Sequence, residues 1–232
     1  MMKRARLAVA LLALAGSAPA FGEDGYLYRA QFVQAAPGRL VELLDLVKSR
    51  RSDVPFVMRH SQGDRWDLLL LTPMGSYGDF YAPERAARRR GAASEGWRDL
   101  VAWREDLFVL GPPLEDVRQA FSGAGFFHLE IFQALPGRQA DLLNERKMEN
   151  TYQKALKRPE SLIFVRDAGA AWDLFTIGFY RDLKHYAESA DIPEADQEAA
   201  AKAAGFEGAS KIGAYLRRFI SQHHDTLAVP VK

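Results

Sequence analysis

One short segment occurs twice in this chain. Residues 34–39 have the sequence QAAPGR and residues 133–138 have the sequence QALPGR. Each copy ends a run of alternating apolar residues and precedes a run whose apolar residues are three and four apart, and this change of period indicates a strand followed by a helix. The Pro-Gly pair supplies the break between the two elements. A chain that contains this joint twice is expected to fold as two related units.

The similarity between the two copies extends beyond the joint. Residues 25–39 align with residues 125–138 with one extra residue in the first copy, and both copies continue into a hairpin with a Gly-containing turn followed by Trp-Asp. Such a turn between two β-rich runs is typical of a hairpin. A helical segment and a short last strand follow in both copies, so each copy has the order β-α-β-β-α-β. The sequence therefore predicts an α+β fold class built from two tandem ferredoxin-like repeats.

The boundaries of the predicted units follow from this alignment. The first repeat is expected over residues 21–113 and the second over residues 125–232, with residues 114–124 as the linker between them. The last helix and the last strand of the two copies are expected over residues 95–103, 106–111, 207–215 and 225–231.

A strand that ends in Q-A-x-P-G-R before a helix, followed by a hairpin with Trp-Asp, resembles the dimeric α/β-barrel superfamily and, within it, NIPSNAP-like domains. The resemblance covers both halves of the chain. It implies that two ferredoxin-like sheets pack face to face around a barrel interior, here as an internal pseudo-dimer. The superfamily includes cofactor-independent monooxygenases, haem-dependent enzymes and members with no established activity, so the fold does not select the function. This sequence has no recognisable haem-ligand motif, and no cofactor is expected.

The first twenty residues have the three parts of a secretory signal peptide. A basic start at residues 3–6 precedes an apolar centre at residues 7–15 and small residues at 18–20. The apolar centre is too short to span a bilayer, although an uncleaved anchor is the alternative interpretation. We expect a periplasmic or secreted protein that is cleaved near Ala20.

The composition excludes several classes of function. The chain contains no Cys, which excludes disulfides, acylation at a lipobox cysteine and thiolate metal sites. A formal net charge of +1 gives no electrostatic reason to expect nucleic acid or an anionic membrane as a partner. Phosphate-binding glycine loops, a nucleophile elbow and the H-E-x-x-H zinc motif are absent.

The first strand of each repeat carries the candidate catalytic residues. Its apolar residues alternate with two polar ones, which are Arg29 and Gln31 in the first copy and His128 and Glu130 in the second. We assign the apolar set to the helix-covered face of the sheet, so the polar set is expected to meet inside the barrel. His128 and Glu130 would transfer protons there while Arg29 stabilises an anion. The alternative is a structural ion pair between Arg29 and Glu130 beside a structural His128.

Trp66 and Trp172 occupy equivalent positions in the two copies, and each is followed by an Asp. Both are candidate ligand-binding residues together with Arg29 and Gln31. A single asymmetric site rarely needs both copies, so we favour a packing role for each Trp and a turn hydrogen bond for each of Asp67 and Asp173.

The segment His223-His224-Asp225 is predicted to end the last helix of the second copy. Adjacent side chains diverge on a helix, so these histidines are not expected to share a metal ion. No metal site is predicted.

Three interpretations of the function remain after these exclusions. The first is the binding of a small apolar or aromatic molecule in the barrel interior, because aromatic and aliphatic residues dominate the strands. The second is a cofactor-independent monooxygenase or isomerase that uses His128 and Glu130. A third interpretation is a protein that only binds a partner protein. No membrane association is expected after cleavage of the signal peptide.

Overall fold

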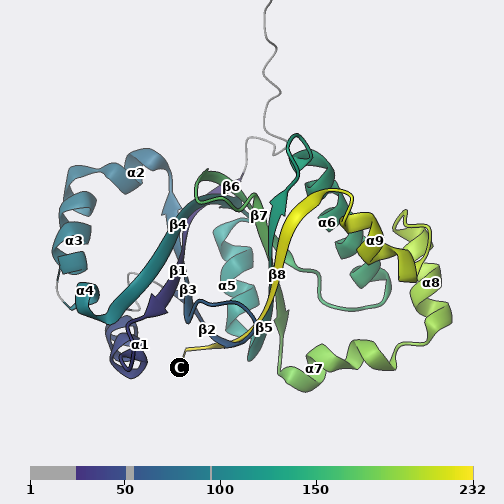
Figure 1. Ribbon diagram of the computed structural model, residues 1–232, viewed down its shortest axis with the longest axis horizontal. Coiled ribbons are helices and arrows are strands. Elements are labelled where there is room, and N and C mark those ends of the chain that lie inside the picture. The colour runs from purple at the N-terminus through teal and green to yellow at the C-terminus, as the bar shows by residue number, and fades with distance from the viewer. Residues whose placement is uncertain (1–24, 51–54, 95, 232) are drawn as a thin grey trace, which may run out of the picture.

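The strands of this protein close into a single antiparallel barrel, flanked on two sides by helices (Figure 1). The computed structural model describes residues 25–50, 55–94 and 96–231, so the predicted signal peptide lies outside the described residues. Within these ranges, no helix has the length and the apolar character that are needed to cross a bilayer.

The two halves contribute corresponding elements to the barrel. The first half contains β1 (Tyr26–Ala35), α1 (Leu40–Ser49), β2 (Phe56–Gln62), β3 (Leu68–Gly75), α2 (Tyr77–Tyr81), α3 (Pro83–Ser94), α4 (Trp97–Leu100) and β4 (Val101–Gly111). The helix α5 (Leu114–Ser122) connects it to the second half. The second half contains β5 (Phe126–Ala134), α6 (Gln139–Ala155), β6 (Leu162–Gly169), β7 (Leu174–Tyr180), α7 (Leu183–Ala187), η1 (Glu188–Asp191), α8 (Glu194–Ala203), η2 (Ala209–Lys211), α9 (Ile212–Leu216) and β8 (Ile220–Pro230).

The strand order is the same in both halves. It is β4-β1-β3-β2 in the first half and β8-β5-β7-β6 in the second, and the barrel closes where β2 pairs with β8 and β4 pairs with β6. The predicted hairpins are confirmed as the β2–β3 and β6–β7 pairs.

The repeated joint has the same backbone geometry in both halves. Gly38 and Gly137 both have a φ of 76°, a left-handed conformation that glycine adopts without steric penalty. In both copies the amide of the following arginine donates a 2.9 Å hydrogen bond to the carbonyl three residues earlier. A turn with Pro at its second position and Gly at its third is the type II turn. In each half, this turn directs the chain from the first strand into the helix that covers the outer face of that strand.

The barrel interior is a packed apolar core to which every strand contributes. Its buried side chains include Tyr28, Ala30, Phe32, Phe127, Leu129, Ile131, Phe164 and Phe175. The segment predicted only as a linker forms α5, which packs against this core through Val117 and Phe121. Side chains thus fill the space in which an apolar ligand was predicted to bind.

One prediction about the first strands is wrong, namely that the interior receives Arg29, Gln31, His128 and Glu130. Alternate residues of a strand face opposite sides, and the interior takes the apolar set. The polar set therefore lies on the outer face, where Val33 packs under α1 and Phe132 packs under α6. The physical reason is that the closed interior excludes water completely, whereas the outer face is covered only in part by helices.

The last strands begin earlier than predicted. β4 begins at Val101 and β8 at Ile220, so the segment His223-His224-Asp225 belongs to a strand and does not end a helix. Asp225 lies opposite Glu130 in the pairing of β8 with β5. Pairing along the full height of the barrel outweighs the local helix preference of these residues. As a result, His223 and Asp225 project from the same face of the sheet as Glu130.

Candidate functional site

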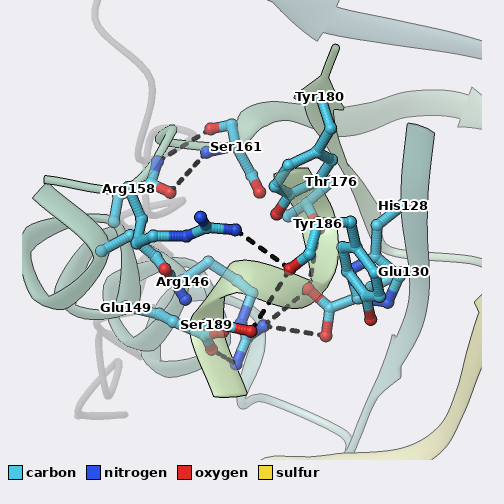
Figure 2. Close-up of a pocket in the computed structure, with 12 residues that line it drawn as sticks. His128, Glu130, Arg146, Glu149, Arg158, Ser161, Thr176, Tyr180, Tyr186 and Ser189 are labelled. Carbon is cyan, nitrogen blue, oxygen red and sulfur yellow. Dashed lines mark hydrogen bonds and ion pairs between the residues drawn. The ribbon is translucent and has the colours of Figure 1, made fainter. Parts of the chain in front are cut away.

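A polar cavity of about 160 Å³ lies in the second half, outside the barrel. The outer faces of β5 and β7 form its floor, α6 forms one wall, and α7 and η1 form another (Figure 2). Its lining comprises His128, Glu130, Arg146, Glu149, Asn150, Gln153, Arg158, Ser161, Thr176, Tyr180, Tyr186 and Ser189. Figure 2 shows the side chains of β5 on one side of the cavity and those of α6 on the other.

Hydrogen bonds from the end of α6 hold the walls of the cavity in place. Asn150 donates to the carbonyl of Ser161 at 2.8 Å and accepts from the amide of Ser161 at 2.9 Å. Arg158 donates to the carbonyls of His185 and Tyr186 at 2.6 Å and 3.0 Å, which ties α7 to the segment after α6. The buried guanidinium of Arg158 is therefore used for structure.

His128 is bound by a carboxylate from the neighbouring strand. Its Nε2 lies 3.1 Å from Oδ1 of Asp225, and its ring lies 5.3 Å from the ring of Tyr186. Burial alone lowers the pKa of His128, but the hydrogen bond to Asp225 and the charge of Glu130 outweigh it, so the pKa is raised. The two histidines, 128 and 223, hold the pKa of Asp225 well below its usual range. This pair favours a charged imidazolium at the cavity wall.

Glu130 lies on the floor of the cavity and is kept ionised. Both of its carboxylate oxygens lie 3.3 Å from Nη1 of Arg146, and the hydroxyl of Thr176 donates to Oε2 at 3.2 Å. Burial raises the pKa of Glu130, but His223 and Arg146 outweigh burial, so the pKa is lowered. Glu130 is therefore a fixed negative charge and a poor proton donor.

Arg146 is the centre of the network, with a side chain that is only 3% exposed. It forms a bidentate ion pair with Glu145, in which the Nε–Oε2 and Nη2–Oε1 distances are 2.6 Å and 2.8 Å. Its Nη2 also lies 2.5 Å from Oε2 of Glu149. One guanidinium thus serves three carboxylates, which favours protonation of one of them.

His223 completes the network from β8. Its Nε2 lies 3.2 Å from Asp225 and 3.7 Å from Glu130 and has no hydrogen-bond partner among the described residues, so these contacts act mainly between charges. Asp225 and then Glu130 raise the pKa of His223 to about 9. Its ring stacks on Phe132, with centroids 5.1 Å apart.

The convergence of Glu130, His223 and Asp225 also bears on metal binding. Three potential ligand atoms of these residues lie within 4.8 Å of one another. His223 and Asp225 are two residues apart on a strand and not on a helix, so their side chains point to the same face of the sheet. However, Arg146 already neutralises Glu130, and a second cation beside a buried guanidinium is electrostatically unfavourable. The arrangement fits an acid–base network better than a metal centre.

The candidate residues of the first half do not join this site. Arg29 pairs with Asp106 of β4 at 2.6 Å, and Gln31 is buried on the outer face of β1. Glu130 is paired with Arg146, so the alternative ion pair between Arg29 and Glu130 is not formed.

The structural interpretation of the two Trp-Asp pairs agrees with the contacts. Trp66 is buried in the interior core, and Trp172 packs against the same core while its Nε1 donates to Glu105 at 2.7 Å. Asp67 accepts from the amide of residue 35 at 2.7 Å, and Asp173 from the amide of residue 134 at 2.8 Å. Neither Trp is among the residues that line the cavity.

Arg146, Glu149 and the role of Asp225 were not predicted from the sequence. Extending the alignment of the two joints places Glu145 and Arg146 at the positions of Leu46 and Val47. A charged pair at apolar positions of a sheet-covering helix was the available indication of a polar site.

No family model and no curated protein matches this chain. Among solved structures, an anthrone oxidase-like protein superposes with a TM-score of 0.62 at 11% identity, covering 90% of this chain and 93% of that one. A monooxygenase-like protein from Lactobacillus acidophilus NCFM gives 0.55 at 8% identity over 90% and 95% of the two chains. A chlorite dismutase-like protein gives 0.54 at 10% identity over 90% and 96%. At this identity the similarity shows the fold, which is of the dimeric α/β-barrel type.

Proposed function

We propose that the cavity of the second half is the active site of an enzyme that removes a proton from a carbon atom of a small molecule, next to an oxygen-bearing carbon. The observation that carries this proposal is the pair formed by His128 and Asp225 at the wall of the polar cavity. An imidazolium in such a place can donate a hydrogen bond to a substrate oxygen and stabilise the enolate that forms when a neighbouring carbon loses its proton. Asp225 keeps the imidazole oriented and charged.

Two reaction types begin with this step. In an isomerase the carbanion is reprotonated at another carbon. In a cofactor-independent monooxygenase the carbanion reacts with O2, and a CH2 group becomes a carbonyl while the second oxygen atom leaves as water. The monooxygenase-like and anthrone oxidase-like names of the structural neighbours support the second type.

The size and lining of the cavity limit the substrate. A cavity of about 150 Å³ is enough for one benzene ring, and the volume here is about 160 Å³. Tyr180 and Tyr186 provide aromatic surface, and the lining also includes the polar side chains of Gln153 and Ser161. The proposed substrate is therefore a single ring, or one end of a larger molecule, that carries oxygen substituents.

Exchange of substrate protons with solvent deuterium tests the proposal, because it detects the shared first step. Wild-type protein is incubated in D2O with a panel of hydroxyquinones, 1,3-diketones and anthrone-type phenols, and NMR follows the exchange while an electrode follows O2 uptake. We expect exchange with at least one class, and a loss of about 100-fold in His128→Gln. Arg29→Gln, at the equivalent position of the first half, is the matched control and should keep the rate. Equal rates for His128→Gln and wild type would contradict the proposal.

We also propose that the chain arose from two tandem repeats and that it is exported. The matching strand orders and joints support tandem ferredoxin-like repeats at 21–113 and 125–232 with an internal pseudo-dimer, and the joint sequence supports the NIPSNAP resemblance. The basic and apolar start supports export and cleavage near Ala20. Sequencing the amino terminus of the purified mature protein tests this, and a start at Met1 would contradict it.

A further inference from the structure

We propose that Glu149 is the catalytic base of this cavity and that it works from α6 opposite His128 on β5. The inference rests on the proposed proton-transfer function and adds to it the group that removes the proton. The sequence pointed to Glu130 for this role, but Glu130 is already bound by Arg146 and Thr176.

The geometry around Arg146 distinguishes the three carboxylates that share it. Glu145 is completely buried and is held by two short hydrogen bonds, so it has no access to the cavity. Glu130 forms part of the floor but is held by donors from two elements. Glu149 lines the cavity, and its Oε2 lies 2.5 Å from Nη2 of Arg146. Its side chain is 25% exposed, which makes it the most accessible of the three carboxylates to a substrate.

The charge balance of the network leaves one proton to exchange. Four carboxylates belong to it, namely Glu130, Glu145, Glu149 and Asp225, and three cationic groups, namely Arg146, His128 and His223. With all cationic groups charged, one negative charge remains uncompensated. Because the three glutamates are mostly removed from solvent, whereas Asp225 is half exposed, this charge favours the uptake of one proton by a glutamate. A carboxyl that gains and loses this proton at the cavity surface has the properties of a general base.

The groups that face Glu149 agree with this assignment. The pKa of Glu149 is raised to about 7, and burial is the largest cause. The charges of Glu130 and Glu145 also raise this pKa, whereas Arg146 and His128 lower it. Tyr152 of α6 and Tyr180 of β7 also face it, and both stay neutral because their own pKa values are raised. A carboxyl whose pKa is raised towards neutrality suits proton transfer in both directions.

The proposed step transfers one proton from a substrate carbon to Glu149. An ionised oxygen of Glu149 takes the proton from the substrate carbon, and the electron pair of the C–H bond moves to the carbonyl oxygen, which accepts a hydrogen bond from His128. In the isomerase case the Glu149 proton returns to a different carbon. In the oxygenase case the carbanion bonds to O2 and the resulting peroxide takes the proton back from Glu149. Loss of the second C–H proton then forms the carbonyl while the O–O bond breaks, and the departing hydroxide takes up that proton and leaves as water.

The test combines Glu149→Gln with the pH dependence of the exchange reaction. In wild type the rate should rise as the pH increases through about 7, because the base must be ionised. Glu149→Gln should lower kcat at least 100-fold with a small change in KM, and should remove this rise. Glu160→Gln, on an exposed carboxylate that pairs with Lys154, is the matched control and should keep both the rate and the profile.

The outcomes separate this inference from the proposed function. Absence of exchange in wild type across the panel overturns both. Exchange in wild type together with an unchanged rate and pH profile in Glu149→Gln overturns only the role of Glu149. The carboxyl carbon of Glu149, observed in wild type by 13C NMR, gives a measurement that does not depend on the variant folding. A midpoint near 7 that matches the kinetic profile supports the inference, and a midpoint below 5 overturns it.

Discussion

The two halves of this barrel place different chemistry on the same framework. The first half has Arg29, Arg104 and Asp106 on the outer face of β1 and β4, with Arg–Asp distances of 2.6 Å and 3.1 Å. The second half has the corresponding set His128, His223 and Asp225 on β5 and β8, with His–Asp distances of 3.1 Å and 3.2 Å. The arrangement is conserved between the halves, but permanent cations in one are titratable cations in the other.

The covering helices differ in the same direction. Val47 of α1 is buried in an apolar cluster, and Leu46 packs against it. At the corresponding positions of α6, Glu145 and Arg146 form a buried ion pair. The helix α6 also continues for 17 residues where α1 has 10, and the extra turns carry Glu149 to Gln153. The apolar helix α1 covers the sheet surface of the first half. The longer and more polar helix α6 leaves a cavity in the second half, and this cavity is lined by groups that can gain or lose protons.

The largest effect is expected from breaking the buried network. Arg146→Met leaves Glu145 and Glu130 without their cation, so the free energy of unfolding should fall by about 3–5 kcal/mol. The corresponding change in the first half, Val47→Ala, removes two methyl groups and should cost about 2 kcal/mol. Urea unfolding of both variants measures the difference. A smaller loss for Arg146→Met than for Val47→Ala would show that the ion pairs do not stabilise the second half.

The next comparison concerns the aspartates on β4 and β8. Asp225→Asn removes the partner that keeps His128 charged, so exchange activity should fall by about 10-fold or more. Asp106→Asn should leave activity within about twofold and reduce stability by less than about 1 kcal/mol, because its ion pairs are partly exposed. Activity and urea midpoints of the two variants provide the check. Equal losses of activity would mean that the two halves share the site.

The pH dependence of stability should also come from the second half. The pKa of His223 is raised to about 9, so its contribution is fully present below the unfolded value of about 6.5 and is lost as the pH rises to 9. The free energy of unfolding should fall by an amount on the order of 3 kcal/mol over this range. In His223→Arg, which copies Arg104, the charge persists and the curve should be flatter. Equal slopes for variant and wild type would assign the loss to other groups.

The smallest effect is expected where the halves are alike. Arg39–Glu42 and Arg138–Asp141 are exposed ion pairs at the starts of α1 and α6. Glu42→Gln and Asp141→Asn should each change stability by about 0.5 kcal/mol or less, and by equal amounts. Thermal unfolding of the two variants tests this. A large difference would show that the covering helices differ already at their first turn.

The architecture was predictable because it depends on local signals that occur twice. The Pro-Gly joints and the Gly-containing hairpins determine the element order, and both copies agree. The orientation of the first strands was not predictable from alternation alone. Alternation separates two sets of residues, but the choice of the interior set depends on closure of the barrel, in which all eight strands of the described chain take part.

The site was predictable only in part. His128 and Glu130 were identified by their place on a strand, and both line the cavity. Glu149 and Asp225 come from α6 and β8, which meet β5 only after folding, and Asp225 was assigned to a helix end. Long-range pairing, which places Asp225 opposite Glu130, lies outside what local patterns indicate.

The most direct test of the difference between the halves is a 15N NMR titration of the five histidines in wild type and in Asp225→Asn. We predict that His223 titrates near pH 9, that His128 titrates above its ordinary value, and that both midpoints fall in the variant. Ordinary midpoints near 6.5 for both residues, unchanged by the substitution, would contradict the charged network and with it the proposed active site.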